Sequence, residues 1–295
     1  MNSELYTRHF GFSERPFTLL PDPDFMYWSR AHARAFTVLE YGLVTRAPLT
    51  VVTGEVGTGK TTLIQALLQQ VHEELTVALI SNAQGGRGDL LRWILNAFAV
   101  EARIGADYVE LFQCFQDFVI DEYSNGKGVV IIIDEAQNLS PAILEELRML
   151  TNINANKDEL LQLILVGQPE LRDVISRPDL RQFRQRVTAT FHLQPLDFET
   201  ACAYVKHRLM HVGGTGSEIT HPALREIYEY SQGIPRIINK TCDIALVYAA
   251  ASNRSKVGLE IFRDLERDGL LLDTGLKESP LILTHHIRGQ EEAAE

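Results

Sequence analysis

The chain has 295 residues, with 45% hydrophobic and 23% charged side chains, which is typical of a globular protein of one or two domains. Its formal net charge of −11 disfavours a protein that coats nucleic acid non-specifically, although a local basic patch is compatible with it. The three cysteines are far apart in the sequence and predict neither a disulfide framework nor a zinc site. There is no signal-peptide core and no apolar run of about 18 residues, so we expect a soluble, cytoplasmic protein.

Aromatic residues and prolines dominate residues 1–28 and indicate an extended segment with turns. Ser29 is a suitable N-cap, and apolar residues between it and Arg46 share one helical face. We expect residues 1–45 to form an N-terminal segment and helix that pack on the domain that follows.

An apolar strand, Leu49–Val52, leads into the pattern G-x-x-x-x-G-K-[ST] between Gly54 and Thr61, and a helix is predicted over Thr61–His72. This context is typical of a phosphate-binding loop, whose glycines turn backbone N–H groups toward the β- and γ-phosphates while the lysine adds a positive charge. The Thr61 hydroxyl is placed to bind Mg²⁺. The predicted nucleotide-binding residues are Gly54, Glu55, Val56, Gly57, Thr58, Gly59, Lys60, Thr61 and Thr62.

Short β-rich runs alternate with helical patterns as far as residue 196. Strands are predicted at 76–80, 129–133, 161–166 and 187–193, and helices at 90–100, 108–123 and 141–149. The continuous apolar run at 129–133 is typical of a strand that is buried on both faces of a parallel sheet. We therefore predict an α/β P-loop domain over residues 46–196, with a parallel sheet flanked by helices.

The strand pattern stops after Pro195. Helices are predicted at 198–210, 222–231, 235–251 and 259–268, which indicates a small all-α lid domain over residues 197–270. Residues 271–295 are weakly patterned and predict a flexible C-terminal tail.

An acidic pair, Asp134 and Glu135, directly follows the apolar run at 129–133. Because the carboxyl ends of parallel strands meet at one edge of a sheet, we expect this pair to lie beside the phosphate-binding loop. Asp134 is then placed to hold Mg²⁺ together with Thr61, and Glu135 to orient the attacking water or accept its proton.

Other side chains are predicted to contact the nucleotide from further along the chain. Gln168 follows the strand at 161–166 and is placed to reach the γ-phosphate or the attacking water. Arg236 follows Pro235 in the first turn of a lid helix and is predicted to project toward the phosphates. Three arginines just before the last strand could supply a positive charge to a neighbouring subunit's nucleotide, and the sequence does not distinguish among Arg181, Arg184 and Arg186.

Together these motifs resemble an AAA+ ATPase, and more narrowly the general secretion pathway protein A (ExeA-type) family with its relatives in mannose-sensitive haemagglutinin pilus clusters. The resemblance covers roughly residues 4–268. It is carried by the stretches 10–12, 16–17, 21–23, 54–62, 134–139, 166–171, 180–186 and 233–239.

The resemblance implies ATP as cofactor with Mg²⁺, ATP hydrolysis, and homo-oligomers in which an arginine acts in trans. It implies Glu135 as the catalytic carboxylate, Gln168 as the first sensor and Arg236 as the second. The implied partners are secretion or pilus assembly proteins at the inner membrane, where the chain would be peripheral or tethered. Secretion-pathway members typically continue into a transmembrane helix and a peptidoglycan-binding region, so we expect either the cytoplasmic part of a longer protein or a free-standing form.

Several alternatives stay open at this level. Five arginines between Arg172 and Arg186 are compatible with a DNA-acting AAA+ regulator of the transposition-ATPase type, which the acidic total charge disfavours. A nucleotide-dependent switch with little turnover is a third possibility. Tyr27 or Trp28 could stack on adenine, although core packing is the commoner role of such residues.

Two weaker candidate sites complete the pattern. His207 and His211 stand four residues apart and could share a metal ion, but a third ligand is not evident, so ordinary surface histidines are the simpler interpretation. The stretch Gly85–Gly88 could contact a partner or nucleic acid in the pore of a ring, although a flexible loop is the simpler interpretation.

Overall fold

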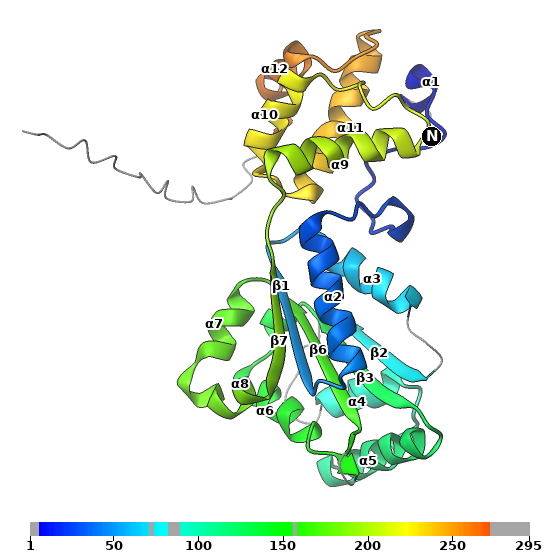
Figure 1. The fold of residues 1–295 in the computed structure, drawn as a ribbon, viewed down its shortest axis with the longest axis vertical. Helices are drawn as coiled ribbons and strands as arrows, with labels where there is room; N and C mark the ends of the chain where they lie inside the picture. Colours follow the sequence, from blue (N-terminus) through cyan, green and yellow to red (C-terminus); the bar gives the residue numbers. More distant parts are fainter. Residues whose placement is uncertain (1–5, 71–73, 82–88, 156–157, 272–295) are drawn as a thin grey trace, which may run out of the picture.

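The computed structural model describes residues 6–70, 74–81, 89–155 and 158–271. An α/β region and a helical region are joined at a narrow waist, with helix α2 standing below the waist beside the sheet (Figure 1). None of the helices in the described ranges is both long and apolar enough to cross a membrane.

Five of the described strands of the α/β region form a sheet in the order β2-β3-β6-β1-β7, and all neighbouring strands in it are parallel. The strands are β1 (Leu49–Gly54), β2 (Leu75–Ser81), β3 (Gly128–Asp134), β6 (Leu161–Gly167) and β7 (Val187–Leu193). Because β1, β3 and β6 are central and run in the same direction, their carboxyl ends meet at one edge of the sheet, next to the waist.

Helices cover both faces of this sheet, as its apolar strands require. The first face is covered by α2 (Arg30–Val44) and α3 (Lys60–Gln70), which pack on Val52, Ile132 and Ile164. Val51, Ile131 and Leu163 point to the opposite face, in accord with the two-residue period of a strand. That face is covered by α4 (Asp89–Ala97), α5 (Tyr108–Ser124), α6 (Pro141–Leu150), α7 (Glu170–Ser176) and α8 (Arg181–Arg186).

The helical region has a hydrophobic core of its own. It is built from α9 (Phe198–His211), α10 (His221–Ser231), α11 (Pro235–Ala251) and α12 (Leu259–Arg267). The N-terminal segment, with α1 (Thr7–Phe10) and the 3₁₀ turn η1 (Pro23–Phe25), adds Tyr6, Phe12, Phe17 and Phe25 to this core. Within the segment predicted over residues 1–45, α2 packs on the sheet, whereas these aromatic side chains lie in the core of the helical region.

The predicted fold class is confirmed, and each strand and helix predicted above is present to within a few residues of its expected bounds. Ser29 caps α2, since its hydroxyl accepts a hydrogen bond from the His32 backbone N–H. The sequence did not predict α7, α8, the 3₁₀ turns η2 (Ala136–Asn138) and η3 (Pro178–Leu180), or the antiparallel pair β4 (Asn154–Ala155) and β5 (Asp158–Glu159). These elements are too short to show a clear hydrophobic period. The predicted tail after residue 271 lies outside the described residues.

Candidate nucleotide site

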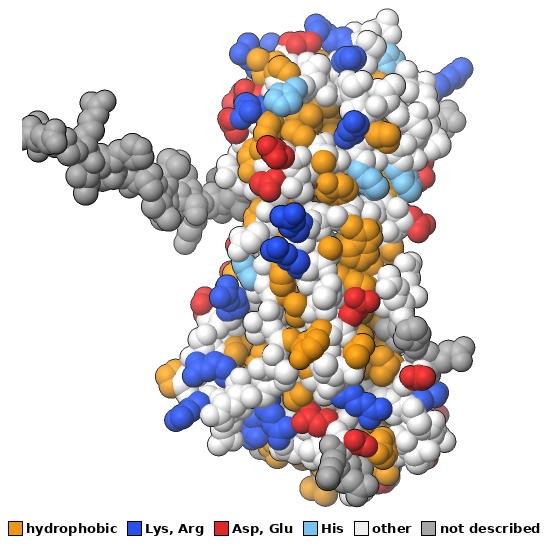
Figure 2. Space-filling view, viewed as in Figure 1, with side chains coloured by type: hydrophobic (Ala, Val, Ile, Leu, Met, Phe, Trp, Pro, Cys, Tyr) orange, Lys and Arg blue, Asp and Glu red, His pale blue; other side chains and the backbone are white. Residues whose placement is uncertain are grey.

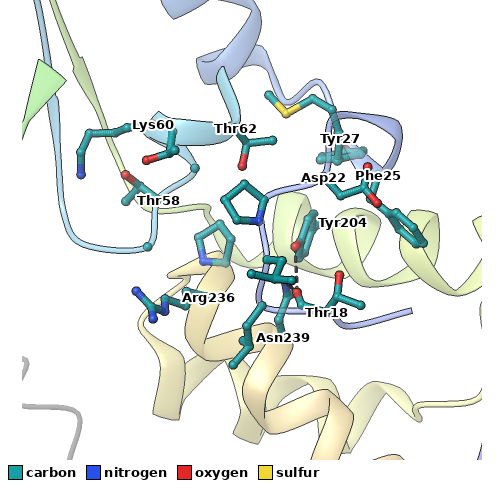
Figure 3. A pocket seen from close by; sticks show the side chains of 18 of the residues that line it. Thr18, Asp22, Phe25, Tyr27, Thr58, Lys60, Thr62, Tyr204, Arg236 and Asn239 are labelled. Atoms are coloured by element: carbon teal, nitrogen blue, oxygen red, sulfur yellow. Dashed lines mark hydrogen bonds between the residues drawn. The ribbon is translucent and has the colours of Figure 1, made fainter. Parts of the chain in front are cut away.

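The phosphate-binding loop borders a cavity of about 370 Å³ at the waist (Figure 3). Loop residues 56–62 form one wall, residues 18–22 and 25–27 of the N-terminal segment form a second, and side chains of α9 and α11 form a third. This volume lies within the range of sites that bind small molecules and cofactors. The cavity is therefore large enough for a nucleotide between the two regions.

The lysine of the loop is held inside it. Lys60 is 7% exposed, and its Nζ donates hydrogen bonds to the backbone oxygens of Gly54 (2.7 Å) and Glu55 (3.0 Å). Burial lowers the pKa of Lys60 below its ordinary value, and the carboxylates of Glu135 and Asp134 partly offset this effect. The ammonium group is thus placed among backbone oxygens that phosphate oxygens can replace.

Oxygen donors suited to Mg²⁺ meet beside this lysine. The Thr61 hydroxyl donates a hydrogen bond of 2.9 Å to Oδ2 of Asp134, although 73 residues separate the two in the sequence. Asp134 is 6% exposed. A hydroxyl and a carboxylate oxygen at hydrogen-bonding distance are the hard ligands that Mg²⁺ binds next to substrate phosphates, so the donor set fits this ion.

Glu135 is held in place by two amide side chains. Its Oε2 accepts hydrogen bonds from Nε2 of Gln137 (2.6 Å) and from Nε2 of Gln168 (3.2 Å), and Oε1 of Gln137 accepts from the Gln168 backbone N–H (2.9 Å). Burial opposes ionisation of Glu135, but these bonds and the Lys60 charge outweigh it and hold the pKa of the carboxyl below its usual range. The carboxylate is therefore ionised at neutral pH, as a general base requires.

The backbone at Glu135 is in a rare conformation. Its φ is +55°, in the left-handed region that non-glycine residues seldom adopt. Such outliers concentrate at functional sites, where the surrounding structure maintains them. The sequence did not predict the contact between Gln137 and Gln168. The two residues are far apart in the chain and meet only because the ends of β3 and β6 are neighbours in the sheet.

A buried histidine supports the loop from behind. His32 of α2 is 5% exposed, and its ring nitrogens contact the Thr58 backbone oxygen through Nε2 (3.0 Å) and the Ser29 hydroxyl through Nδ1 (2.7 Å). Because a carbonyl only accepts, Nε2 carries the proton and Nδ1 accepts from the hydroxyl. Burial lowers the pKa of His32, which keeps the ring neutral. A histidine in the first turn of an apolar helix does not by itself predict this role.

The helical region touches the loop at Arg236. The Arg236 backbone N–H donates to the Gly57 oxygen (3.2 Å), and the Arg236 side chain extends along the loop. At Gly57, where φ is +84°, an added Cβ would lie 2.5 Å from the Arg236 Cβ. Arg236 therefore lies next to the phosphate-binding loop, and only a glycine at position 57 permits this approach.

Part of the cavity wall is apolar, beside polar residues such as Thr18, Asp22 and Asn239. Leu20, Met26 and Tyr27 line this apolar part, together with Leu196 from the connection between the regions. Tyr27 packs edge-on against Tyr204, at 6.0 Å between ring centroids. Trp28 packs on Phe36 instead and is not among the side chains that line the cavity. Of the two aromatic candidates for a base contact, Tyr27 is therefore the one that borders the cavity.

The arginines of α8 lie away from the cavity of their own chain. Arg184 donates to the Ser176 oxygen (3.2 Å), and Arg186 contacts Asn152 and forms an ion pair with Glu159 (3.8 Å). Arg181 is exposed and has no hydrogen bond or ion pair with any residue within the described ranges. This placement is compatible with a role in a neighbouring subunit, for which Arg181 is the least engaged side chain.

The weaker candidates gain no support. His207 and His211 pack against Tyr27 and Phe25, at 5.4 Å and 4.3 Å between ring centroids, and the described residues contain no cluster of three metal-ligating side chains. Residues Gly85–Gly88 lie outside the described residues. Cys114, Cys202 and Cys242 are free thiols.

Comparisons with known proteins agree with this geometry. A family model described as an AAA domain matches residues 44–175. The chain is 42% identical over 253 residues to General secretion pathway protein A from Aeromonas hydrophila, and the match covers 86% of this chain and 46% of that protein. The chain thus spans about half the length of this relative.

Solved structures share the architecture at low identity. They include ORC2 from Aeropyrum pernix (TM-score 0.60, 19% identity, 85% of this chain and 70% of that chain) and Cdc6p from Pyrobaculum aerophilum (0.63, 16%, 84% and 71%). A RuvB variant from Thermotoga maritima is similar too (TM-score 0.54, 19% identity, 88% of this chain and 76% of that chain). These likenesses show the AAA+ fold alone. The chain therefore carries an AAA domain, and most of its length is similar to part of General secretion pathway protein A.

Proposed function

We propose that this chain binds ATP with Mg²⁺ at the waist, hydrolyses it, and uses nucleotide-dependent self-association to assist assembly of a bacterial envelope machine. The observation that carries the hydrolytic part is the convergence of Thr61, Asp134, Glu135 and Gln168 beside the phosphate-binding loop. The envelope role rests on the similarity to General secretion pathway protein A.

Each group has a chemical task in this proposal. Backbone N–H groups of the loop and the Lys60 ammonium neutralise the phosphates. Thr61 and Asp134 would hold Mg²⁺, which offsets charge on the β- and γ-phosphates when it is bound. Glu135 accepts a hydrogen bond from the attacking water and orients it, while Gln168 positions both Glu135 and the γ-phosphate.

The remaining charge is supplied by arginines. Arg236 reaches the phosphates from the helical region, so the position of that region depends on the nucleotide. One arginine of α8 is supplied by a neighbouring subunit, and this requirement couples hydrolysis to self-association. Self-association then transmits the nucleotide state to secretion or pilus assembly proteins at the inner membrane.

A second candidate function is DNA binding. Lys and Arg side chains gather over α7 and α8 on the face shown in Figure 2. Arg172 and Arg184 also line a second cavity, of about 250 Å³. These observations favour a local anion-binding surface on an otherwise acidic chain.

The experiment is the ATPase rate against protein concentration, for the wild type and Glu135→Gln, combined with sizing under ATP. A rate per chain that rises with concentration, is lost in Glu135→Gln and ignores DNA supports the oligomeric ATPase. Stimulation by DNA that weakens steeply with salt supports the DNA-acting alternative. An exposed carboxylate on α2, changed in Glu40→Gln, gives the control for loss of one charge. Absence of turnover under every condition would contradict ATP hydrolysis, and the absence of any effect of DNA would contradict the DNA-acting alternative.

A further inference from the structure

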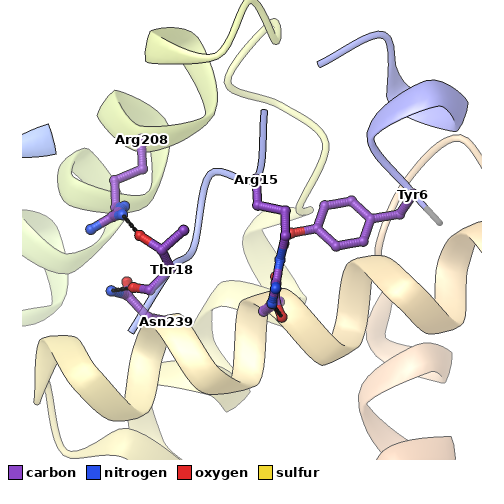
Figure 4. Close-up of polar contacts among 6 residues, drawn as sticks. Tyr6, Arg15, Thr18, Arg208 and Asn239 are labelled. Atoms are coloured by element: carbon purple, nitrogen blue, oxygen red, sulfur yellow. Dashed lines mark hydrogen bonds and ion pairs between the residues drawn. The ribbon is translucent and has the colours of Figure 1, made fainter. Parts of the chain in front are cut away.

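A closed set of four buried or half-buried hydrogen bonds joins the N-terminal segment to the helical region. Nδ2 of Asn239 donates to the Thr18 backbone oxygen (3.2 Å), and the Tyr204 hydroxyl donates to Oδ1 of Asn239 (2.7 Å). Nη1 of Arg208 donates to the Tyr204 hydroxyl (3.1 Å), and Nη2 returns to the Thr18 hydroxyl (3.3 Å). Figures 3 and 4 show that Thr18 lies between side chains of α9 and α11.

The buried guanidinium of Arg208 makes separation of the N-terminal segment from the helical region unfavourable. Arg208 is 7% exposed, and no carboxylate of the described ranges forms an ion pair with it. Its Nε donates to the Pro16 oxygen (2.5 Å), and its guanidinium lies 4.7 Å from the Phe25 ring centroid. Hydrogen-bond acceptors and an aromatic face of the N-terminal segment therefore stabilise the buried charge of Arg208. Detachment of the segment would leave the guanidinium without these partners, which is strongly unfavourable.

A second pair of contacts extends the attachment toward the N-terminus. Tyr6 and Arg15 both bond the carboxylate of Asp243 on α11 (Figure 4). The segment is thus bound to the helical region from residue 6 to residue 18. It then runs through residues 18–22 and 25–27, which line the cavity, and enters α2 at the α/β region.

Tyr27 of the cavity wall therefore packs on the same helical region as Arg236, whereas Met26 packs against the core of α2 and α3. We propose that Tyr204, Asn239 and Arg208 are positioning residues, which fix the wall that binds the nucleoside base and so set affinity for the base separately from affinity for the phosphates. This inference rests on the proposed ATP site. The chemistry of the wall, with Leu20, Met26 and Tyr27, suits the flat apolar faces of a purine base.

The test compares two ligands that share phosphates and differ in the base. Binding of ATP and of inorganic tripolyphosphate, each with Mg²⁺, is measured by calorimetry for the wild type, Tyr204→Phe and Asn239→Leu. Tyr204→Phe keeps the ring but removes the hydroxyl that joins Arg208 to Asn239. We expect the affinity for ATP to fall about tenfold in both variants, with the affinity for tripolyphosphate unchanged. Tyr248→Phe, which removes an exposed hydroxyl of α11, is the matched control.

The outcomes separate this inference from the proposed function. ATP affinity that stays at the wild-type value, or equal losses for ATP and tripolyphosphate, would overturn the positioning role and leave the ATP site intact. A wild type that binds neither ligand would overturn both. If either variant fails to fold by circular dichroism, Thr18→Val, which removes only the acceptor of Arg208 Nη2, carries the same comparison.

Discussion

The backbone N–H of Arg236 donates a hydrogen bond to the carbonyl oxygen of Gly57, so the first turn of α11 rests directly on the phosphate-binding loop. A second backbone contact lies just before α11, where the Leu196 N–H donates to the Gly233 oxygen (2.9 Å). These two backbone contacts fix the end of α11 between the loop and the connection that leaves β7. A change in either is expected to alter both stability and nucleotide binding.

Gly233→Ala is expected to destabilise the protein strongly. Gly233 has φ +73°, and an added Cβ would lie 2.0 Å from the Leu196 oxygen. Gly269 has a similar φ of +70° but open space around it, so Gly269→Ala carries only the backbone strain, of about 1 kcal/mol. We expect the free energy of unfolding to fall by at least about 2 kcal/mol more in Gly233→Ala, because the backbone must move to relieve the clash. If urea titrations gave equal losses in the free energy of unfolding for the two variants, the backbone near the Leu196 oxygen would be able to move aside without cost.

Gln137→Leu is expected to shift the acidic limb of the ATPase profile. The variant removes the hydrogen bond that Gln137 donates to Glu135, which helps to hold the pKa of that carboxyl below its usual range. The pKa should therefore rise, and kcat should begin to fall at a higher pH than in the wild type. The measurement is kcat between about pH 5 and 8. Gln113→Leu, at an exposed amide of α5, is the control, and an unmoved limb in Gln137→Leu would contradict the assignment.

Substitutions of the α8 arginines are expected to have different effects, on turnover for Arg181 and on stability for Arg186. Arg181→Ala should keep the wild-type stability and lose at least about 10²-fold in turnover, since an arginine supplied in trans stabilises charge at the γ-phosphate. Arg186→Ala should lower the stability, because it removes contacts with Asn152 and Glu159. Mixing Arg181→Ala with Glu135→Gln should restore part of the activity, as each variant supplies the group the other lacks. Full activity of Arg181→Ala alone would transfer the role to another arginine.

His32 is expected to make stability depend on pH. Burial lowers the pKa of its ring in the folded protein, whereas in the unfolded chain it titrates near 6.5. The unfolded state therefore binds more protons, and this contribution to stability is present above about pH 6.5 and is lost as the pH falls toward the folded pKa. In His32→Gln, the free energy of unfolding between about pH 5 and 7.5 should depend less on pH. His221→Gln is the control for removal of a surface imidazole, and an unchanged slope in His32→Gln would argue against a buried neutral ring.

The sequence by itself determined the fold class and most of the phosphate end of the site. The run from Leu49 to Thr61 combines a strand, a glycine-rich loop and a helix start, and each of these is set by neighbouring residues. The apolar run before Asp134 has a length and composition that favour a buried parallel strand, so its acidic end could be placed at the edge of the sheet. Patterns of this kind are local and can be followed along a single chain.

Only the tertiary structure decided the contacts that close the site. Gln137 meets Gln168 because β3 and β6 are neighbours in the sheet, and His32 meets Thr58 because α2 packs behind the loop. The N-terminal aromatic residues join the core of the helical region, an assignment that their composition alone does not settle. Such contacts join residues tens to hundreds of positions apart, and they depend on which surfaces pack together. The hydrophobic pattern of one segment carries no information about its partner, so these relationships arise only when the whole chain is folded.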